Sequence, residues 1–157
     1  MKPMLRALRQ DDQEFLFKLY ASTREQEFAA FNWPAAQLEA FLRMQFMAQQ
    51  RSYASNYEHC EHQIIELNGT PIGQMQVNWE KDSALLVDIS LLPEHRGQGL
   101  GGALLRELME QCSNKGLPLK LQVLHTNPAR RLYERLGFIR TGEDQMYVQM
   151  MCPADSH

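Results

Sequence analysis

The spacing of apolar residues changes along the chain and separates expected helices from expected strands. Apolar side chains recur three and four positions apart over about 12–22 and again over 34–50, which predicts two amphipathic helices. Asp11 or Asp12 is expected to cap the first helix, and Pro34 suits the first turn of the second. This part of the chain is therefore expected to form a pair of helices.

Two segments without a clean helical period, 22–33 and 51–60, are expected to be loops. Short alternating or β-branched runs predict strands. The expected strands cover residues 3–8, 63–67, 71–80, 84–92, 118–124 and the two arms of a hairpin within 138–151. Asn68-Gly69 is a strong signal for a tight turn, so the strands on either side of it are expected to pair antiparallel.

A glycine-rich segment follows the strand that ends before Pro93. Glycines occupy four of the six positions in 97–102, at the start of a helix expected over 98–114 and ended by Gly116. Glycine lets the backbone approach a ligand closely, and the first N–H groups of a helix attract negative charge together with its dipole. We therefore expect a phosphate-bearing ligand at this segment, with Arg96 adding positive charge nearby.

Two familiar phosphate-binding motifs fit this segment poorly. A nucleotide P-loop needs Gly-Lys-Ser/Thr before its helix, and no lysine occurs here. Gly97, Gly99 and Gly102 match the spacing of the dinucleotide fingerprint, but Pro93–Arg96 intervene after the strand. The next strand also ends in Leu-His, without the acidic residue that the fingerprint requires. Both nucleotide interpretations are therefore disfavoured.

The order of elements, βααβββαβαββ, predicts an α/β protein with a mixed sheet and helices on both faces. The strand 84–92, the helix 98–114 and the strand 118–124 form a unit that predicts a right-handed crossover between two parallel strands. A last helix is expected over 128–136. The length of the chain predicts one domain over residues 1–157.

Two separate sequence blocks resemble the GNAT-type, acetyl-CoA-dependent N-acetyltransferase family. The first is Arg96-x-x-Gly99-x-Gly101, which resembles that family's R/Q-x-x-G-x-G/A signature for the pyrophosphate of the coenzyme. The preceding strand ends in Pro93, three residues before the arginine, as the family's fourth strand does. This block agrees with the phosphate site expected from the glycines alone.

The second block lies about thirty residues later and resembles the family's N-x-x-A-x-x-x-Y-x-x-x-G-F pattern. It reads Asn127-Pro-Ala-Arg-Arg-Leu-Tyr133-Glu-Arg-Leu-Gly137-Phe138. The family's small residue appears here as Ala129. The resemblance covers residues 60–150, whereas the first 50 residues match only in the order of their elements.

The resemblance implies a GNAT-like fold in which the parallel strand pair lies at a coenzyme cleft. It implies acetyl-CoA as co-substrate, no metal, and direct attack of a bound primary amine on the thioester in a ternary complex. Its implied catalytic groups are Tyr133, as acid, and the N–H of Leu91, as oxyanion donor. The residues implied to bind the coenzyme are Ile89, Leu91, Arg96, Gly97, Gln98, Gly99, Leu100, Gly101, Gly102, Asn127, Ala129, Arg130 and Tyr133.

Several of these residues also have purely structural interpretations. A phenol titrates near 10, somewhat above a thiol, so Tyr133 can protonate a departing thiolate, but it can also simply pack on a helix face. Asn127 can cap the last helix, bind the pantetheine arm, or do both. Arg130 and Arg131 can equally be solvated surface charges.

The sequence leaves the general base open. Asp88 and Ser90 are expected to face the side of the strand opposite Val87, within reach of the cleft. Glu25 and Glu27, in the expected loop before Pro34, and water are the other candidates.

The same expected loop holds aromatic residues, in the region that lines the acceptor site in this family. One hypothesis is that Phe28, Phe31 and Trp33, together with the acids, line a binding site for a cationic amine. The simpler interpretation is that the aromatics pack in the protein and the acids are solvated. His125 is expected to be a loop histidine rather than a residue of the cleft. The run 59–62 has metal-ligand residue types, but neighbouring strand positions point to opposite faces, so no zinc is expected.

Composition narrows the class of partner. A net charge of −3 argues against a nucleic-acid or anionic-membrane surface. No apolar run is long enough to span a membrane, the first residues lack a secretory signal, and three scattered cysteines suit a reducing cytoplasm. We therefore expect a cytoplasmic monomer or homodimer that acts on a small-molecule amine or on a peptide or protein amine. The alternatives are a non-catalytic acyl-CoA sensor and an acyltransferase for a longer acyl-CoA.

Overall fold

The computed structural model describes residues 2–154, apart from the side chains of Gln26 and Glu27. Its helices are α1 (Gln13–Phe28), α2 (Ala35–Asn56), α3 (Leu100–Asn114) and α4 (Ala129–Leu136), with short 3-10 turns η1 (Gln10–Asp12), η2 (Ala29–Phe31) and η3 (Pro93–His95). Its strands are β1 (Met4–Ala7), β2 (Cys60–Leu67), β3 (Thr70–Trp79), β4 (Ala84–Leu91), β5 (Leu119–Leu124), β6 (Ile139–Glu143) and β7 (Tyr147–Cys152). The predicted α/β order of elements is confirmed.

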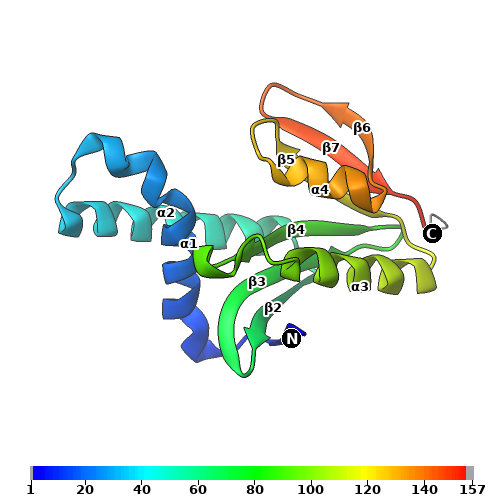
Figure 1. The fold of residues 1–157 in the computed structure, drawn as a ribbon, viewed down its shortest axis with the longest axis horizontal. Coiled ribbons are helices and arrows are strands. Elements are labelled where there is room, and N and C mark those ends of the chain that lie inside the picture. The colour runs from blue at the N-terminus through cyan, green and yellow to red at the C-terminus, as the bar shows by residue number, and fades with distance from the viewer. Residues whose placement is uncertain (1, 155–157) are drawn as a thin grey trace.

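The strands form one sheet in the order β1-β2-β3-β4-β5-β7-β6. Only β4 and β5 are parallel, and they pair at just two positions, Ala84 with Leu119 and Leu85 with Lys120. Residues 86–91 and 121–124 continue both strands beyond the last paired residues. The sheet therefore splits between β4 and β5, and β5, β7 and β6 diverge from the other strands (Figure 1).

The main apolar core lies between the sheet and the α3–α4 layer. Leu104, Leu105 and Leu108 of α3 are buried and belong to one cluster with Met75 and Val77 of β3. Side chains alternate between the faces of a strand, so Gln74 and Gln76 lie on the other face of β3. There they line a cavity with residues of α1 and α2. Helices thus cover both faces of the sheet, as predicted.

The predicted ends of the first two helices are wrong. The segment 22–33 was expected to be a loop, but α1 continues to Phe28, and α2 continues to Asn56 through the expected loop 51–60. Both extensions are rich in polar residues with adequate helix propensity and contain no proline or glycine. Phe46, Tyr53 and Tyr57 also extend the helical spacing of α2, a signal that the polar composition obscured.

Asp12, one of the two predicted N-cap residues, occupies the N-cap position of α1, but its side chain makes no capping hydrogen bond. No side chain caps α1, and Asp12 instead accepts hydrogen bonds from Arg6 at 2.9 and 2.8 Å and from the Arg9 amide at 2.7 Å. Arg6 also donates to Glu66 at 2.6 Å. The hydrogen bond from Arg6 lowers the pKa of Asp12 to about 2, so the pair is charged at neutral pH. This cluster fixes the start of α1 to β1 and β2.

The predicted hairpin turn at Asn68-Gly69 is confirmed. Both residues have left-handed φ angles, 55° and 80°, as a tight turn between twisted antiparallel strands requires. Within residues 2–154, no helix combines the length and the apolar character needed to cross a membrane.

Candidate active site

The glycine-rich segment forms an open cradle at the amino end of α3. Gly97 and Gly99 have φ angles of 73° and 80°, and a Cβ atom at either position, or at Gly101, would meet nothing within 4 Å. No side chain caps this end of α3, so the first N–H groups of the helix face open space. The cradle therefore has both the room and the donors that a diphosphate needs.

The side chain of Arg96 ties this cradle to the end of β4. Its Nε donates a hydrogen bond to the carbonyl of Leu91 at 2.9 Å, and Gln98 Nε2 donates to the carbonyl of Glu94 at 3.0 Å. The guanidinium thus lies where the strand meets the loop, next to the predicted phosphate site. The loop conformation is set by these bonds as well as by the glycines.

The backbone of β4 offers hydrogen-bonding groups to the gap in the sheet. The N–H of Leu92 donates to Ile72 of β3 at 2.8 Å. Successive N–H groups of an extended strand point to opposite edges, so the N–H groups of Leu91 and Ile89 point toward β5. The β4–β5 pairing has already ended at Leu85, so β5 pairs with neither amide; the Ile89 amide instead interacts with the Asp88 carboxylate.

Tyr133 lies on α4 at the other side of this gap. Its side chain is 8% exposed, and its ring packs edge-on against Phe138 with centroids 5.7 Å apart. Its hydroxyl has no hydrogen-bond partner among the residues whose side chains are described. Burial, together with the charge of Asp88, raises the pKa of Tyr133 to about 12. The phenol is therefore protonated at neutral pH and available as a donor.

The remaining residues of the second sequence block have identifiable structural contacts. Asn127 Oδ1 accepts a hydrogen bond from the amide of Ala129 at 2.9 Å, at the start of α4. Arg130 Nε lies 3.6 Å from Glu134 on the helix surface. His125 Nε2 bonds to the carbonyl of Asp144 at 2.8 Å and so belongs to the loop, as expected. The capping interpretation of Asn127 fits, and a contact with the coenzyme stays a prediction.

A polar network lies on the sheet face under α1 and α2. Gln74 Nε2 donates to Asp88 Oδ2 at 2.7 Å and to Ser90 Oγ at 3.4 Å. Gln74 Oε1 lies 2.7 Å from His62 Nε2, and Ser90 Oγ donates to Asp88 at 3.3 Å. One glutamine thus connects a histidine on β2 with an aspartate on β4.

The positions of the hydrogens in this network follow from which groups can donate and which can only accept hydrogen bonds. A carboxylate only accepts, so the amide nitrogen of Gln74 must face Asp88 and its oxygen must face His62. His62 Nε2 therefore carries a hydrogen. Burial lowers the pKa of His62, so the neutral imidazole keeps its lone pair on Nδ1.

Asp88 has the environment of a carboxylate that can accept a proton. Burial raises its pKa, although the hydrogen bonds from Gln74 and Ser90 oppose the shift. The charge of Asp88 raises the pKa of Tyr133 across the gap and also that of Tyr53, in which burial is the larger cause. The Asp88 carboxylate and the Tyr133 phenol therefore influence each other electrostatically.

A β-bulge at Val87 explains how these groups are divided between the two faces. The register runs from Val77 opposite Leu86 to Gln76 opposite Asp88, so Val87 is an extra residue. The prediction that Val87 and Asp88 point to opposite faces of the sheet is wrong. The bulge leaves both on the same face, and Val87 lines the second cavity. The predicted placement of Asp88 and Ser90 on the side away from the main core is confirmed by their bonds to Gln74.

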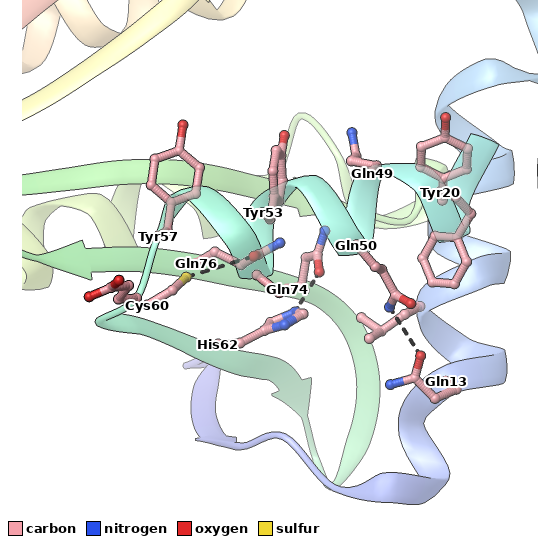
Figure 2. A pocket seen from close by; sticks show the side chains of 14 residues that line it. Gln13, Tyr20, Gln49, Gln50, Tyr53, Tyr57, Cys60, His62, Gln74 and Gln76 are labelled. Carbon is pink, nitrogen blue, oxygen red and sulfur yellow. Dashed lines mark hydrogen bonds between the residues drawn. The ribbon is translucent and has the colours of Figure 1, made fainter.

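Two cavities have Tyr53 of α2 and Tyr57, which directly follows α2, in common. The first, of about 440 Å³, lies between α1, α2 and the sheet, and Figure 2 shows it with His62, Gln74 and Gln76 rising from the strands. The second, of about 620 Å³, lies at the gap between β4 and β5 and extends to β6 and β7. Together they form a cleft on the opposite side of the sheet from α3.

Sequence reasoning missed most of the residues that line this cleft. Tyr53, Tyr57, Gln74, Gln76 and Tyr147 come from α2, β3 and β7 and belong to no local motif. The one available signal was the alternation of Gln74 and Gln76 with apolar residues on β3, which places two amides on one face.

The acids and aromatics expected in a loop before Pro34 lie elsewhere. Glu25 is an exposed residue of α1, and the side chain of Glu27 lies outside the described residues. Phe28, Phe31 and Trp33 pack against one another with ring centroids 5.9 to 6.3 Å apart, and none of them lines either cavity. The simpler interpretation, aromatic packing, is therefore the one that the structure supports.

The run 59–62 does not gather metal ligands. His59 donates its backbone N–H to Asn78 Oδ1 at 3.1 Å, and Glu61 accepts from the Trp79 indole at 3.2 Å. Cys60 and His62 face the first cavity. Within the described residues, no three His, Cys, Asp or Glu side chains lie close enough together to hold a metal ion.

The cradle, the split sheet and the second sequence block agree with a comparison against known families. Residues 8–138 match the Acetyltransferase (GNAT) family. The chain therefore belongs to the GNAT acetyltransferase family, as the two sequence blocks predicted.

Individual relatives add detail. The chain is 45% identical over 58 residues, 36% of its length, to [Ribosomal protein bS18]-alanine N-acetyltransferase of Haemophilus influenzae, and 35% identical over 81 residues, 50% of its length, to a putative enzyme of the same name from Bacillus subtilis. These matches span 40% and 54% of the relatives' own lengths. PaiA N-acetyltransferase from Thermoplasma acidophilum, solved in complex with coenzyme A, is 21% identical over 98% of this chain and 99% of its own, with a TM-score of 0.74. That likeness supports the fold.

Proposed function

We propose that the protein is an N-acetyltransferase that moves the acetyl group of acetyl-CoA to an amine of a polypeptide. The proposal rests on one observation. The cradle and Tyr133, which belongs to the apolar core beside α3, lie on one face of the sheet, and the Asp88 side chain lies on the other face, where it bonds to Gln74. A thioester placed in the gap would meet an amine that enters from the α2 face.

In this proposal the coenzyme binds along the edge of β4. Its diphosphate occupies the cradle of residues 97–102, with Arg96 at the strand end, and its pantetheine arm follows the edge of β4 at Ile89 and Leu91, whose amides do not pair with β5. Asn127, Ala129 and Arg130 lie at the start of α4 beside the arm. The family to which the chain belongs supports acetyl-CoA as the co-substrate.

The chemistry follows as direct transfer. Asp88 takes one proton from the ammonium group, directly or through water, and the free amine attacks the thioester carbon. The N–H of Leu91 stabilises the oxyanion that forms. The carbon–sulfur bond then breaks, Tyr133 protonates the thiolate, and the new amide nitrogen loses its second proton to solvent.

The choice of a polypeptide acceptor has separate support. The two relatives described above are named for the alanine of a ribosomal protein. The cleft also consists of two neighbouring cavities, of about 440 and 620 Å³, that both have Tyr53 and Tyr57 in their lining. A narrow pocket for a small amine would not need this much space.

The test is release of free coenzyme A thiol from acetyl-CoA in the presence of different amines. The panel contains alanine amide, a short peptide beginning with alanine, a peptide with only a lysine amine, and a linear polyamine. We expect thiol release that depends on the amine, greatest with the alanine peptide, and a mass increase of that peptide by one acetyl group.

Two other results would change the assignment. Tight binding of acetyl-CoA with no amine-dependent thiol release would mean that the protein is an acyl-CoA sensor. Faster turnover of a longer acyl-CoA than of acetyl-CoA would replace the acyl donor in the proposal. The Tyr133→Phe protein is the matched control, because it keeps the fold and the cradle but lacks the proposed acid.

A further inference from the structure

Gln76 has an amide group that its surroundings satisfy only in part. It lies on the floor of the first cavity and is 7% exposed. Its Oε1 accepts a weak hydrogen bond from the Cys60 thiol at 3.8 Å, and its Nε2 has no acceptor among the residues whose side chains are described. This nitrogen is accessible from the cavity, where an oxygen of water or of a ligand can accept its hydrogen bond.

In the structure the oxygen of this amide lies beside the Cys60 thiol. Burial raises the pKa of Cys60, so the sulfur keeps its hydrogen and acts as the donor in the pair. The amide oxygen of Gln76 therefore faces Cys60, and the nitrogen faces the cavity. Figure 2 shows the side chain rising from β3 beneath α2, with Tyr53 on the helix above it.

Gln76 differs in this respect from its neighbour Gln74. Both ends of the Gln74 amide are engaged, by His62 and by Asp88. Gln76 stands directly opposite Asp88 in the β3–β4 register, where Cβ atoms are about 5 Å apart, yet it does not bond to it. A donor with no protein acceptor thus lies beside the proposed proton acceptor.

We propose that Gln76 Nε2 binds a carbonyl oxygen of the acceptor, so that the site selects an α-amino amide, the first residue of a polypeptide, over an amine without a carbonyl. This inference rests on the proposed acetyl transfer. In an α-amino amide the amine nitrogen and the carbonyl oxygen are only about 3 Å apart, given standard bond lengths. An amine at Asp88 therefore brings its own carbonyl to Gln76, whereas a polyamine would leave this donor unpaired.

The experiment compares two proteins with two acceptors. The proteins are the wild type and Gln76→Leu, and the acceptors are alanine amide and 2-aminobutane, which has CH₂ and CH₃ in place of the carbonyl and amide groups. We expect the substitution to lower kcat/KM for alanine amide by roughly 3- to 10-fold more than for 2-aminobutane, the worth of one neutral hydrogen bond. The different basicities of the amines cancel, because each amine is compared with itself.

Controls separate this effect from misfolding. Gln63→Leu changes a glutamine of β2 that lines neither cavity and should leave the ratio between the two acceptors unchanged. Acetyl-CoA affinity and the melting temperature show whether each variant is folded. If Gln76→Leu does not fold, Gln76→Met, which keeps an unbranched chain of similar length, takes its place.

The possible failures are distinguishable. Equal fold-losses with the two acceptors would overturn the role of Gln76 while leaving acetyl transfer intact. Absence of thiol release with every amine would overturn the proposed function and this inference together.

Discussion

The two faces of the sheet are built on different principles. The α3–α4 face has a continuous apolar core, and its ligand-binding groups are backbone amides at a helix start and along one strand. The α1–α2 face has a smaller apolar contact and two cavities lined by glutamine and tyrosine side chains. One face thus presents main-chain groups at fixed positions, and the other presents side chains that come from distant elements.

This difference suggests a division of labour. Backbone donors depend on conformation and not on side-chain identity, so they suit a ligand that stays the same. Side-chain donors such as Gln74 and Gln76 can change with one substitution, so they suit an acceptor that differs between relatives. The reacting groups lie where the two faces meet, at the gap between β4 and β5.

Tyr133→Phe should have the largest effect. Loss of the proposed acid is expected to lower kcat by about 100-fold or more, because general acid catalysis contributes about 10²–10⁴. The affinity for acetyl-CoA, measured by titration calorimetry, should stay nearly the same, since the ring still packs on Phe138. Unchanged kcat would remove Tyr133 from the chemistry and leave it as a packing residue.

Asp88→Asn should lower kcat/KM by roughly 10- to 100-fold and also change its pH dependence. A base works only when deprotonated, and burial raises the pKa of Asp88. Wild-type activity should therefore fall as the pH is lowered through a value above about 4, the ordinary pKa of aspartate. The Asn variant should lack this acidic limb.

The groups that face Asp88 make a control possible. They are Gln74, Ser90, Arg24, Tyr53 and Tyr133. His62 reaches Asp88 only through Gln74, so His62→Gln should retain the acidic limb. Loss of the limb in His62→Gln, with retention in Asp88→Asn, would assign the titration to the histidine.

A substitution in the cradle is expected to have a smaller effect, which is on acetyl-CoA binding. Gly99→Ala adds a Cβ where only open space exists, so the methyl group would occupy the proposed diphosphate site and weaken acetyl-CoA binding by roughly 10-fold. Gly116→Ala is the matched control. The φ angle of Gly116 is 69°, close to the 80° of Gly99, and a Cβ atom there would also meet nothing within 4 Å. Gly116 lies beyond the other end of α3, so its substitution causes the same backbone strain away from the proposed diphosphate site. Equal loss of affinity in both variants would contradict the cradle.

The α3–α4 side of the sheet could be predicted from the sequence, whereas most of the α1–α2 side could not. The cradle, the parallel strands and the turn at Asn68-Gly69 follow from glycine, proline and local periodicity, which act within a few residues. The contact between Gln74 and Asp88 depends on the register of two strands, and the bulge at Val87 has no sequence signal. Helix α2 was predicted too short because Arg51–Asn56 is polar, although its tyrosines keep the helical spacing.

The single extra residue in β4 has a consequence for evolution of the acceptor site. If Val87 were accommodated without a bulge, side chains would alternate through it, and the carboxylate of Asp88 would share the layer of the apolar core with Leu86. The extra residue therefore has to be absorbed at this point for Asp88 and Ser90 to stay on the polar face while Ile89 and Leu91 stay on the core face. Relatives with a new acceptor are expected to vary the residues around this irregularity and to keep the irregularity itself.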